Sequence, residues 1–147
     1  MNKLQLDFKL SRSSIVLAGA TKGVGLELAK LLIKCEAKVG IIGRTKSDGE
    51  KAIGELRKKN KNSEVFFIQG DLYSDEDRSE IFKSIEVIFP QGINHLVSFL
   101  GSGKTPFGTD VGINTWKEVF DKNFFSVINL VDTFLPLLKK NKDHNSI

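Results

Sequence analysis

Short apolar runs recur along the chain and are separated by longer amphipathic stretches. Each run is rich in β-branched or aromatic residues and has a glycine at or near its end, a pattern that is typical of strands buried in a parallel sheet. The runs cover residues 13–20, 38–44, 65–71 and 93–101. The sequence therefore predicts a strand in each run.

The stretches between and after these runs carry apolar residues at spacings of three and four, which predict helices. In the stretch after the first run, the apolar positions are Val24, Leu28, Leu31 and Leu32. The remaining predicted helices cover residues 46–60, 74–89 and 115–140. Ser74 is the expected N-cap of its helix, and Asp77 occupies the acidic position of a capping box.

Strands and helices alternate in the order β-α-β-α-β-α-β-α along the chain. That order requires a parallel sheet with right-handed crossovers and with helices on both faces. Neither a linker nor a second pattern interrupts the alternation. We therefore expect one α/β domain over residues 1–147.

Composition narrows the class of protein without indicating an activity. The 147 residues are 40% hydrophobic and 27% charged, as in ordinary globular domains. The net charge of +4 is spread over predicted helix faces and loops rather than along a basic stripe with aromatics, so we expect no nucleic-acid partner. The single cysteine, Cys35, suits a reducing compartment. Because no apolar run approaches the ~20 residues of a membrane span, we expect a cytoplasmic protein without membrane association.

The segment GSGKT at 101–105 is similar to the end of an ATP-binding P-loop but departs from it. A P-loop needs Gly-x-x-x-x-Gly-Lys-Ser/Thr, with a helix that begins at the lysine. Ser98 occupies the position of the first glycine, and Pro106 follows Thr105 and disfavours helical angles there. We therefore expect no nucleoside triphosphate at this loop.

A second glycine cluster lies between the first predicted strand and helix. Gly19 allows a tight turn, Gly23 lets the backbone approach a pyrophosphate, and Gly25 lets the helix pack against the strand. The N–H groups and the partial positive charge at the start of the helix suit phosphates. The pattern predicts a dinucleotide site, with Thr21 and Val24 in the same turn.

The residue after the second predicted strand indicates which dinucleotide is bound. NAD sites usually carry Asp or Glu there, which binds the ribose 2′-hydroxyl. This chain has Arg44, whose guanidinium matches a 2′-phosphate, and Lys22 in the glycine turn can add a second positive charge. Together the two residues favour NADP over NAD. The alternative is that both are solvated surface cations.

These features together resemble the N-terminal part of the short-chain dehydrogenase/reductase family. Residues 19–25, GATKGVG, match the family's Thr-Gly-x-x-x-Gly-x-Gly turn, with Ala18 in place of the threonine. Asp71 and Leu72 match the pair that holds the adenine, although a turn aspartate would look the same. Asn123 matches the asparagine that helps to position the catalytic lysine through water.

The resemblance implies a Rossmann-type, doubly wound parallel sheet of strand order 3-2-1-4, truncated before a fifth strand. It also implies NADP-dependent carbonyl reduction or alcohol oxidation on a substrate that the sequence does not identify. The predicted helix 115–140 resembles the family's interface helix and implies a homo-oligomer. Its apolar residues for that surface are Trp116, Val119, Phe120, Val127, Leu130 and Phe134.

The chain departs from the family pattern after the fourth predicted strand. The family carries Asn-Asn-Ala-Gly where this chain has Ser-Phe-Leu-Gly at 98–101, so that Gly101 alone is retained, on the nicotinamide side. Phe99 and Leu100 could instead belong to the core. Pro106 and Phe107 match a common loop element of the family.

A second departure concerns the catalytic acid. The family's Tyr-x-x-x-Lys does not occur, since Tyr73, the one tyrosine, is followed four residues on by Asp77. The chain reaches its last residues, HNSI, where the family's fifth strand would begin. We therefore expect no normal turnover from these residues alone.

Two alternatives to a reductase stay open. The chain could be a non-catalytic module that docks through the face beside the fourth strand, where Leu96, Val97 and Phe99 would be exposed. It could also be the product of an interrupted reductase gene.

Overall fold

The structure is a computed structural model that describes residues 10–103, 111–142 and 146–147. At its centre is a parallel sheet of order β3-β2-β1-β4, which confirms the predicted strand order. The strands are β1 (Ser14–Ala18), β2 (Lys38–Gly43), β3 (Val65–Gln69) and β4 (His95–Ser98). Each is shorter than its apolar run, since β1 and β3 end one residue before the glycine of the run, β2 ends at Gly43, and β4 ends three residues before Gly101.

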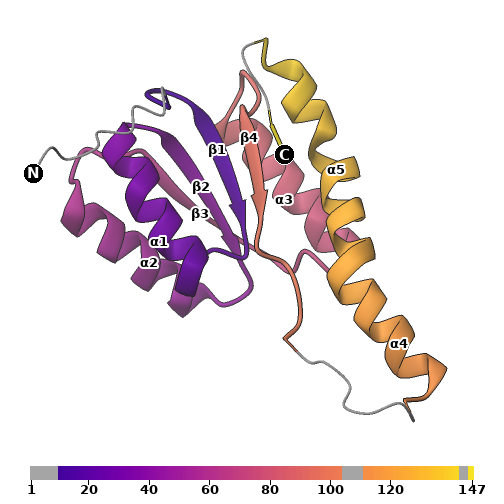
Figure 1. Cartoon of the computed structure of the whole chain (residues 1–147). Coiled ribbons are helices and arrows are strands. Elements are labelled where there is room, and N and C mark those ends of the chain that lie inside the picture. Colours follow the sequence, from indigo (N-terminus) through magenta and orange to yellow (C-terminus); the bar gives the residue numbers. More distant parts are fainter. Residues whose placement is uncertain (1–9, 104–110, 143–145) are drawn as a thin grey trace, which may run out of the picture.

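Helices cover both faces of the sheet (Figure 1). One face carries α1 (Gly23–Leu32), the 3₁₀ turn η1 (Ile33–Cys35) and α2 (Lys46–Lys59). The other face carries α3 (Asp75–Ile88) and the C-terminal helical segment, which runs through α4 (Ile113–Phe120), the π-helical turn η2 (Asp121–Phe125) and α5 (Ser126–Lys140). The layers are those of a doubly wound α/β domain.

The core consists of two apolar clusters, one on each face of the sheet. Successive residues of β1 point to opposite faces, so that Ile15 and Leu17 join the cluster under α1 and α2. Val16 and Ala18 join the cluster under α3 and α5. All four side chains are at most 2% exposed, because a central parallel strand is covered on both faces.

Two of the four apolar positions that predicted α1 face away from the core. Val24 and Leu31 are 76% and 57% exposed, whereas Leu32 is buried and Leu28 packs against the cluster that contains Leu26 and Ala29. At Gly25 the helix packs closely on the turn that follows β1, where an added Cβ would lie 2.7 Å from Ala20. Gly25 and Ala29 carry little hydrophobic signal, so the spacing of the larger apolar side chains did not identify them as packed positions.

The predicted helix 115–140 is confirmed as one helical segment, but part of its expected interface face is core. Leu130 and Phe134 are fully buried against the sheet and α3, so their assignment to a dimer surface is wrong. Trp116 and Phe120 at the start of the segment are exposed. Figure 1 shows why, since α5 lies along the sheet and α4 extends past its end.

The expectation that Leu96 is exposed at the sheet edge is also wrong. Leu96 is 1% exposed, while Val97 and Phe99 are half-buried. Ser146 pairs in parallel with His95, and its carbonyl accepts a hydrogen bond from the Leu96 N–H at 3.1 Å. The last residues of the chain thus lie against β4, where a fifth strand was expected to begin.

Within the described residues, no helix combines the length and the apolar character that crossing a bilayer requires.

Candidate functional site

A cleft of about 290 Å³ opens at the carboxyl ends of the strands. Ligands of open α/β sheets bind at this edge, at the point where the strand order reverses. Here that point lies between β1 and β4, whose following loops both line the cleft. Of the residues singled out in the sequence, the cleft is lined by Gly19, Thr21, Lys22, Arg44, Asp71, Leu72 and Gly101. Gly23, Val24, Gly25 and Asn123 are not among its lining residues.

The turn between β1 and α1 forms the floor of the cleft. Gly19 has φ +79°, which a residue with a side chain rarely adopts, and its N–H donates to the Ile42 carbonyl at 3.0 Å. Gly23, at φ +58°, begins α1, and no atom lies within 4 Å of the position of an added Cβ. Lys22 forms no side-chain cap, so the first N–H groups of α1 are available to an anion.

The second wall is built by the end of β2 and the start of α2. Arg44 directly follows β2 with an exposed side chain, and its carbonyl accepts a hydrogen bond from Gln69 Nε2 at 3.3 Å. Lys22 Nζ lies 2.8 Å from the carboxylate of Asp48 in the first turn of α2. The positive charge of Lys22 is therefore already paired, which its sequence position did not indicate.

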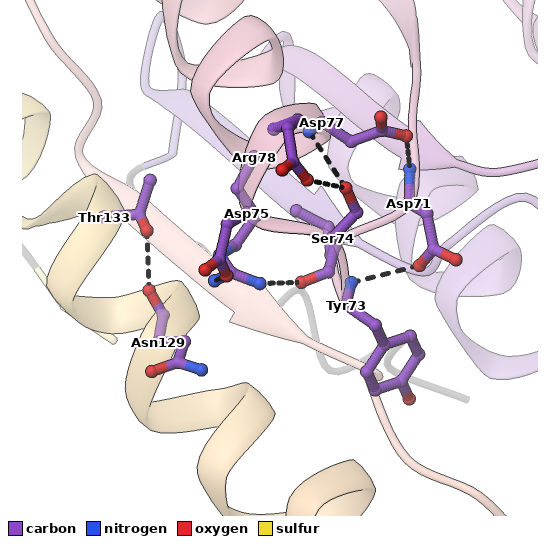
Figure 2. A network of polar contacts seen from close by, with 10 residues as sticks. Asp71, Tyr73, Ser74, Asp75, Asp77, Arg78, Asn129 and Thr133 are labelled. Atoms are coloured by element: carbon purple, nitrogen blue, oxygen red, sulfur yellow. Dashed lines mark hydrogen bonds and ion pairs between the residues drawn. The ribbon is translucent and has the colours of Figure 1, made fainter.

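A hydrogen-bonded network after β3 holds Asp71 at the cleft (Figure 2). Asp77 Oδ2 accepts from the Asp71 N–H at 2.7 Å, and Asp71 Oδ1 accepts from the Tyr73 N–H at 3.0 Å. Ser74 Oγ accepts from the Asp77 N–H at 3.3 Å, which confirms the predicted N-cap of α3. Asp77 does not close a capping box, because its carboxylate turns to Asp71 instead.

Arg78, on α3, also holds the loop that carries Asp71 and Leu72. Its side chain is buried, its Nη1 donates to the Leu72 carbonyl at 2.8 Å, and its Nη2 pairs with Asp75. Leu72 is itself 3% exposed and joins the core under α3. The position of the Asp71–Leu72 pair is thus set by α3 and by the core beneath it.

The loop after β4 forms the opposite side of the cleft. Phe99 and Leu100 are half-buried, line the cleft and pack on the cores of opposite sheet faces. Asn123 Oδ1 accepts from the Ser102 N–H and its Nδ2 donates to the Val119 carbonyl, both at 2.9 Å. Asn123 therefore fastens the loop to η2.

Two polar side chains of the cleft escaped the sequence analysis. Thr45 and Asp48 both line the cleft, at the start of α2. Their spacing, Thr-x-x-Asp, is typical of a helix start and could have drawn attention to the segment. Its approach to Lys22 could not be found this way, because that contact joins separate elements. Pro106, Phe107 and the Lys104–Thr105 end of the rejected P-loop lie outside the described residues.

The parallel sheet, the glycine turn and the cleft at the reversal of strand order define a Rossmann-type dinucleotide-binding fold. The sequence profile of the short chain dehydrogenase family matches residues 13–146. The chain therefore belongs to this family, and the resemblance noted in the sequence is confirmed.

Relatives and solved structures agree with this assignment. An uncharacterized oxidoreductase of Schizosaccharomyces pombe is 30% identical over 135 residues, which are 87% of this chain and 49% of the relative. A short chain oxidoreductase of Pseudomonas aeruginosa PAO1 with an atypical catalytic center is 26% identical, with a TM-score of 0.82 over 92% of this chain and 51% of its own. It has also been solved with NADPH bound.

An NADH-dependent reductase solved with NAD shares the fold, at 22% identity and a TM-score of 0.77 over 89% of this chain and 54% of its own. Across these comparisons, the chain spans about half the length of the proteins it matches.

Proposed function

We propose that these residues form the cofactor-binding half of an NADP-dependent short-chain reductase or dehydrogenase. The observation that carries the proposal is the convergence of the glycine turn, Arg44 and Asp71 on one cleft at the reversal of strand order. NADPH and NAD in the solved relatives support a dinucleotide here. Arg44, in place of an acidic residue, supports NADP.

Each wall of the cleft has a distinct part in holding the cofactor. The N–H groups at the start of α1 would bind the pyrophosphate beside Gly23, where no atom lies within 4 Å of the position of an added Cβ. Arg44 would bind the 2′-phosphate, and the Asp71 carboxylate would accept a hydrogen bond from the adenine. Gly101 would lie on the nicotinamide side, where the bound cofactor supplies or takes a hydride.

The proton-transfer groups of such a reaction do not come from these residues. Tyr73 is the one tyrosine, and it lies beside Asp71 at the adenine side of the cleft. Its hydroxyl lies 3.5 Å from the Lys122 carbonyl and no lysine follows it at the required spacing. We propose that the 147 residues bind cofactor without turnover, and that Asn123 acts on a catalytic lysine only where the rest of the fold is supplied.

The test is a titration of the purified chain with NADPH and with NADH, followed by melting temperature. A ligand at 100 times its Kd that binds only the folded state adds about 2.7 kcal/mol. We expect Arg44→Ser to raise the Kd for NADPH by about 10- to 100-fold, since it removes charge-assisted hydrogen bonds. The Kd for NADH should stay nearly unchanged. Lys51→Ser, which removes an exposed charge from α2 away from the cleft, is the control. No stabilisation by either nucleotide would favour the non-catalytic alternative.

We also propose that the chain self-associates through the start of its C-terminal helical segment. The exposed large apolar side chains there are Ile113, Trp116, Phe120, Phe124, Phe125 and Ile128. Several exposed large apolar side chains on one helical segment are typical of protein interfaces. Sedimentation should show that Phe120→Ser with Phe124→Ser gives monomers. The control Val87→Ser, at an 80% exposed position on α3, should not.

A cytoplasmic location belongs to the same proposal. It is supported by the single cysteine, Cys35, whose thiol is free, because proteins of reducing compartments rarely contain disulfides.

A further inference from the structure

The part of the cleft that is proposed to hold the 2′-phosphate also contains an acidic side chain. Asp48 lines the cleft together with Arg44 and Thr45, and its carboxylate lies 2.8 Å from Lys22 Nζ. Asp48 belongs to the first turn of α2, and Lys22 to the turn between β1 and α1. The ion pair therefore joins two walls of the cleft.

The two partners of this pair differ in freedom. The side chain of Lys22 is 72% exposed and that of Asp48 is 21% exposed, so the lysine extends over the cleft to a more enclosed carboxylate. Among the described residues, Arg44 has no carboxylate partner. Arg44 is thus the free cation at this end, while the charge of Lys22 is offset.

The opposed charges have different consequences for the two cofactors. A 2′-phosphate carries a charge of about −1.5 to −2 and is repelled by a nearby carboxylate. A ribose 2′-hydroxyl is neutral and can donate a hydrogen bond to a carboxylate. Arg44 and Asp48, which line the same cleft, therefore favour opposite forms of the cofactor.

We propose that Asp48 is a specificity-determining residue that limits the preference for NADP. It repels the 2′-phosphate, holds Lys22 away from it, and offers an acceptor to the 2′-hydroxyl of NAD. This inference rests on the proposed function, because it assumes that the cleft binds a dinucleotide. With Arg44 and Asp48 in the same cleft, the preference of the chain for NADP over NAD is smaller than Arg44 alone would give.

Asp48 also has a structural role that must be separated from specificity. A negative charge in the first turn stabilises a helix through its macrodipole, whichever nucleotide is bound. Loss of that role lowers the melting temperature of the free protein. It does not change the ratio of the Kd values for NADPH and NADH, which is therefore the decisive measurement.

The experiment measures Kd for NADPH, NADH, 2′,5′-ADP and 5′-AMP with the wild type and Asp48→Asn. We expect Asp48→Asn to lower the Kd for NADPH and 2′,5′-ADP by about tenfold. The Kd values for NADH and 5′-AMP should stay the same or rise. Lys22→Met should weaken NADPH more in the Asp48→Asn background than in the wild type, because the lysine is then free to bind phosphate. Glu50→Gln removes a carboxylate from the same helix outside the cleft and is the matched control.

The outcomes separate this inference from the function on which it rests. An NADPH-to-NADH ratio in Asp48→Asn within about twofold of the wild type, as in Glu50→Gln, overturns the role of Asp48. Asp48→Ser gives the same readout if the asparagine variant folds poorly. Absence of binding by the wild type to all four nucleotides overturns the proposed function itself.

Discussion

The two ends of the C-terminal helical segment are both apolar in sequence but have opposite environments. In α5, Leu130, Phe134 and Leu137 are at most 1% exposed. In α4 and η2 no residue is buried, and Phe120 and Phe124 are each 53% exposed. An apolar helix face is therefore a core face only where another layer of the protein lies behind it.

Within the C-terminal helical segment, the sheet provides that layer for α5 and not for α4 or η2. Phe134 packs with the cluster on the α3 face of the sheet, and its ring lies 6.1 Å from the ring of Phe82 on α3. Phe124 instead meets Phe125, at a ring distance of 5.2 Å, on a surface open to solvent. The first pair stabilises the fold, and the second is available to another molecule.

The largest expected effect compares these two phenylalanines. Phe134→Ala should lower the free energy of unfolding by about 3–5 kcal/mol, because it leaves a cavity in the core. Phe124→Ala should cost less than about 1 kcal/mol, because its ring is half in solvent. Urea denaturation at a protein concentration that keeps the chain monomeric measures both. Equal losses would show that the exposed face is packed in the free protein.

A pair of glycines extends the comparison to the backbone. Gly92 has φ +87°, and an added Cβ would lie 2.3 Å from the Leu137 carbonyl oxygen, so Gly92→Ala should cost about 2–4 kcal/mol. Gly112, at the start of α4, has φ −60° and no atom within 4 Å of an added Cβ. Gly112→Ala should cost less than about 1 kcal/mol, because the poorer N-cap is partly offset by the lower entropy of the unfolded chain. A similar melting temperature for the two variants would contradict the tight approach of α5 to Gly92.

The turn between the two ends can be tested through Asn123. Asn123→Ala removes the acceptor of the Ser102 N–H and should cost about 0.5–1 kcal/mol, with faster hydrogen exchange at Ser102. Asn114→Ala, at an exposed position in α4, is the matched control and should leave that exchange rate unchanged. Unchanged exchange in Asn123→Ala would mean that η2 does not fasten the loop.

The smallest effect concerns the edge of the sheet beside α5. Burial lowers the pKa of His95 from its ordinary 6.5, and its Nδ1 lies 2.7 Å from Ser146 Oγ. The unfolded chain therefore binds the proton more readily, so stability should fall as the pH drops from 6.5 through the folded pKa and then level off. Unfolding free energies measured between pH 7.5 and 5 should lose part of this slope in His95→Asn. A slope that is identical in both proteins would exclude His95 as its source.

Most elements of the fold could be predicted because local interactions specify them. The alternation of apolar runs with helical periods identified the four strands of the described sheet, and the resemblance to the family implied their order. Ser74 was recognised as an N-cap from its immediate neighbours. Part of the packed face of α1 could not be predicted, since Gly25 and Ala29 are small and give no strong hydrophobic signal. The covered part of the C-terminal helical segment was missed for the related reason that periodicity does not measure contact.

The sequence by itself determined the class of the protein: a parallel α/β fold with a glycine turn, in the short chain dehydrogenase family. These features depend on φ angles, helix caps and periodicity within a few residues. Only the tertiary structure decided that Lys22 pairs with Asp48, that Asp77 holds Asp71, and which apolar faces stay open. Each of these depends on how the chain folds back on itself, which local sequence patterns do not record.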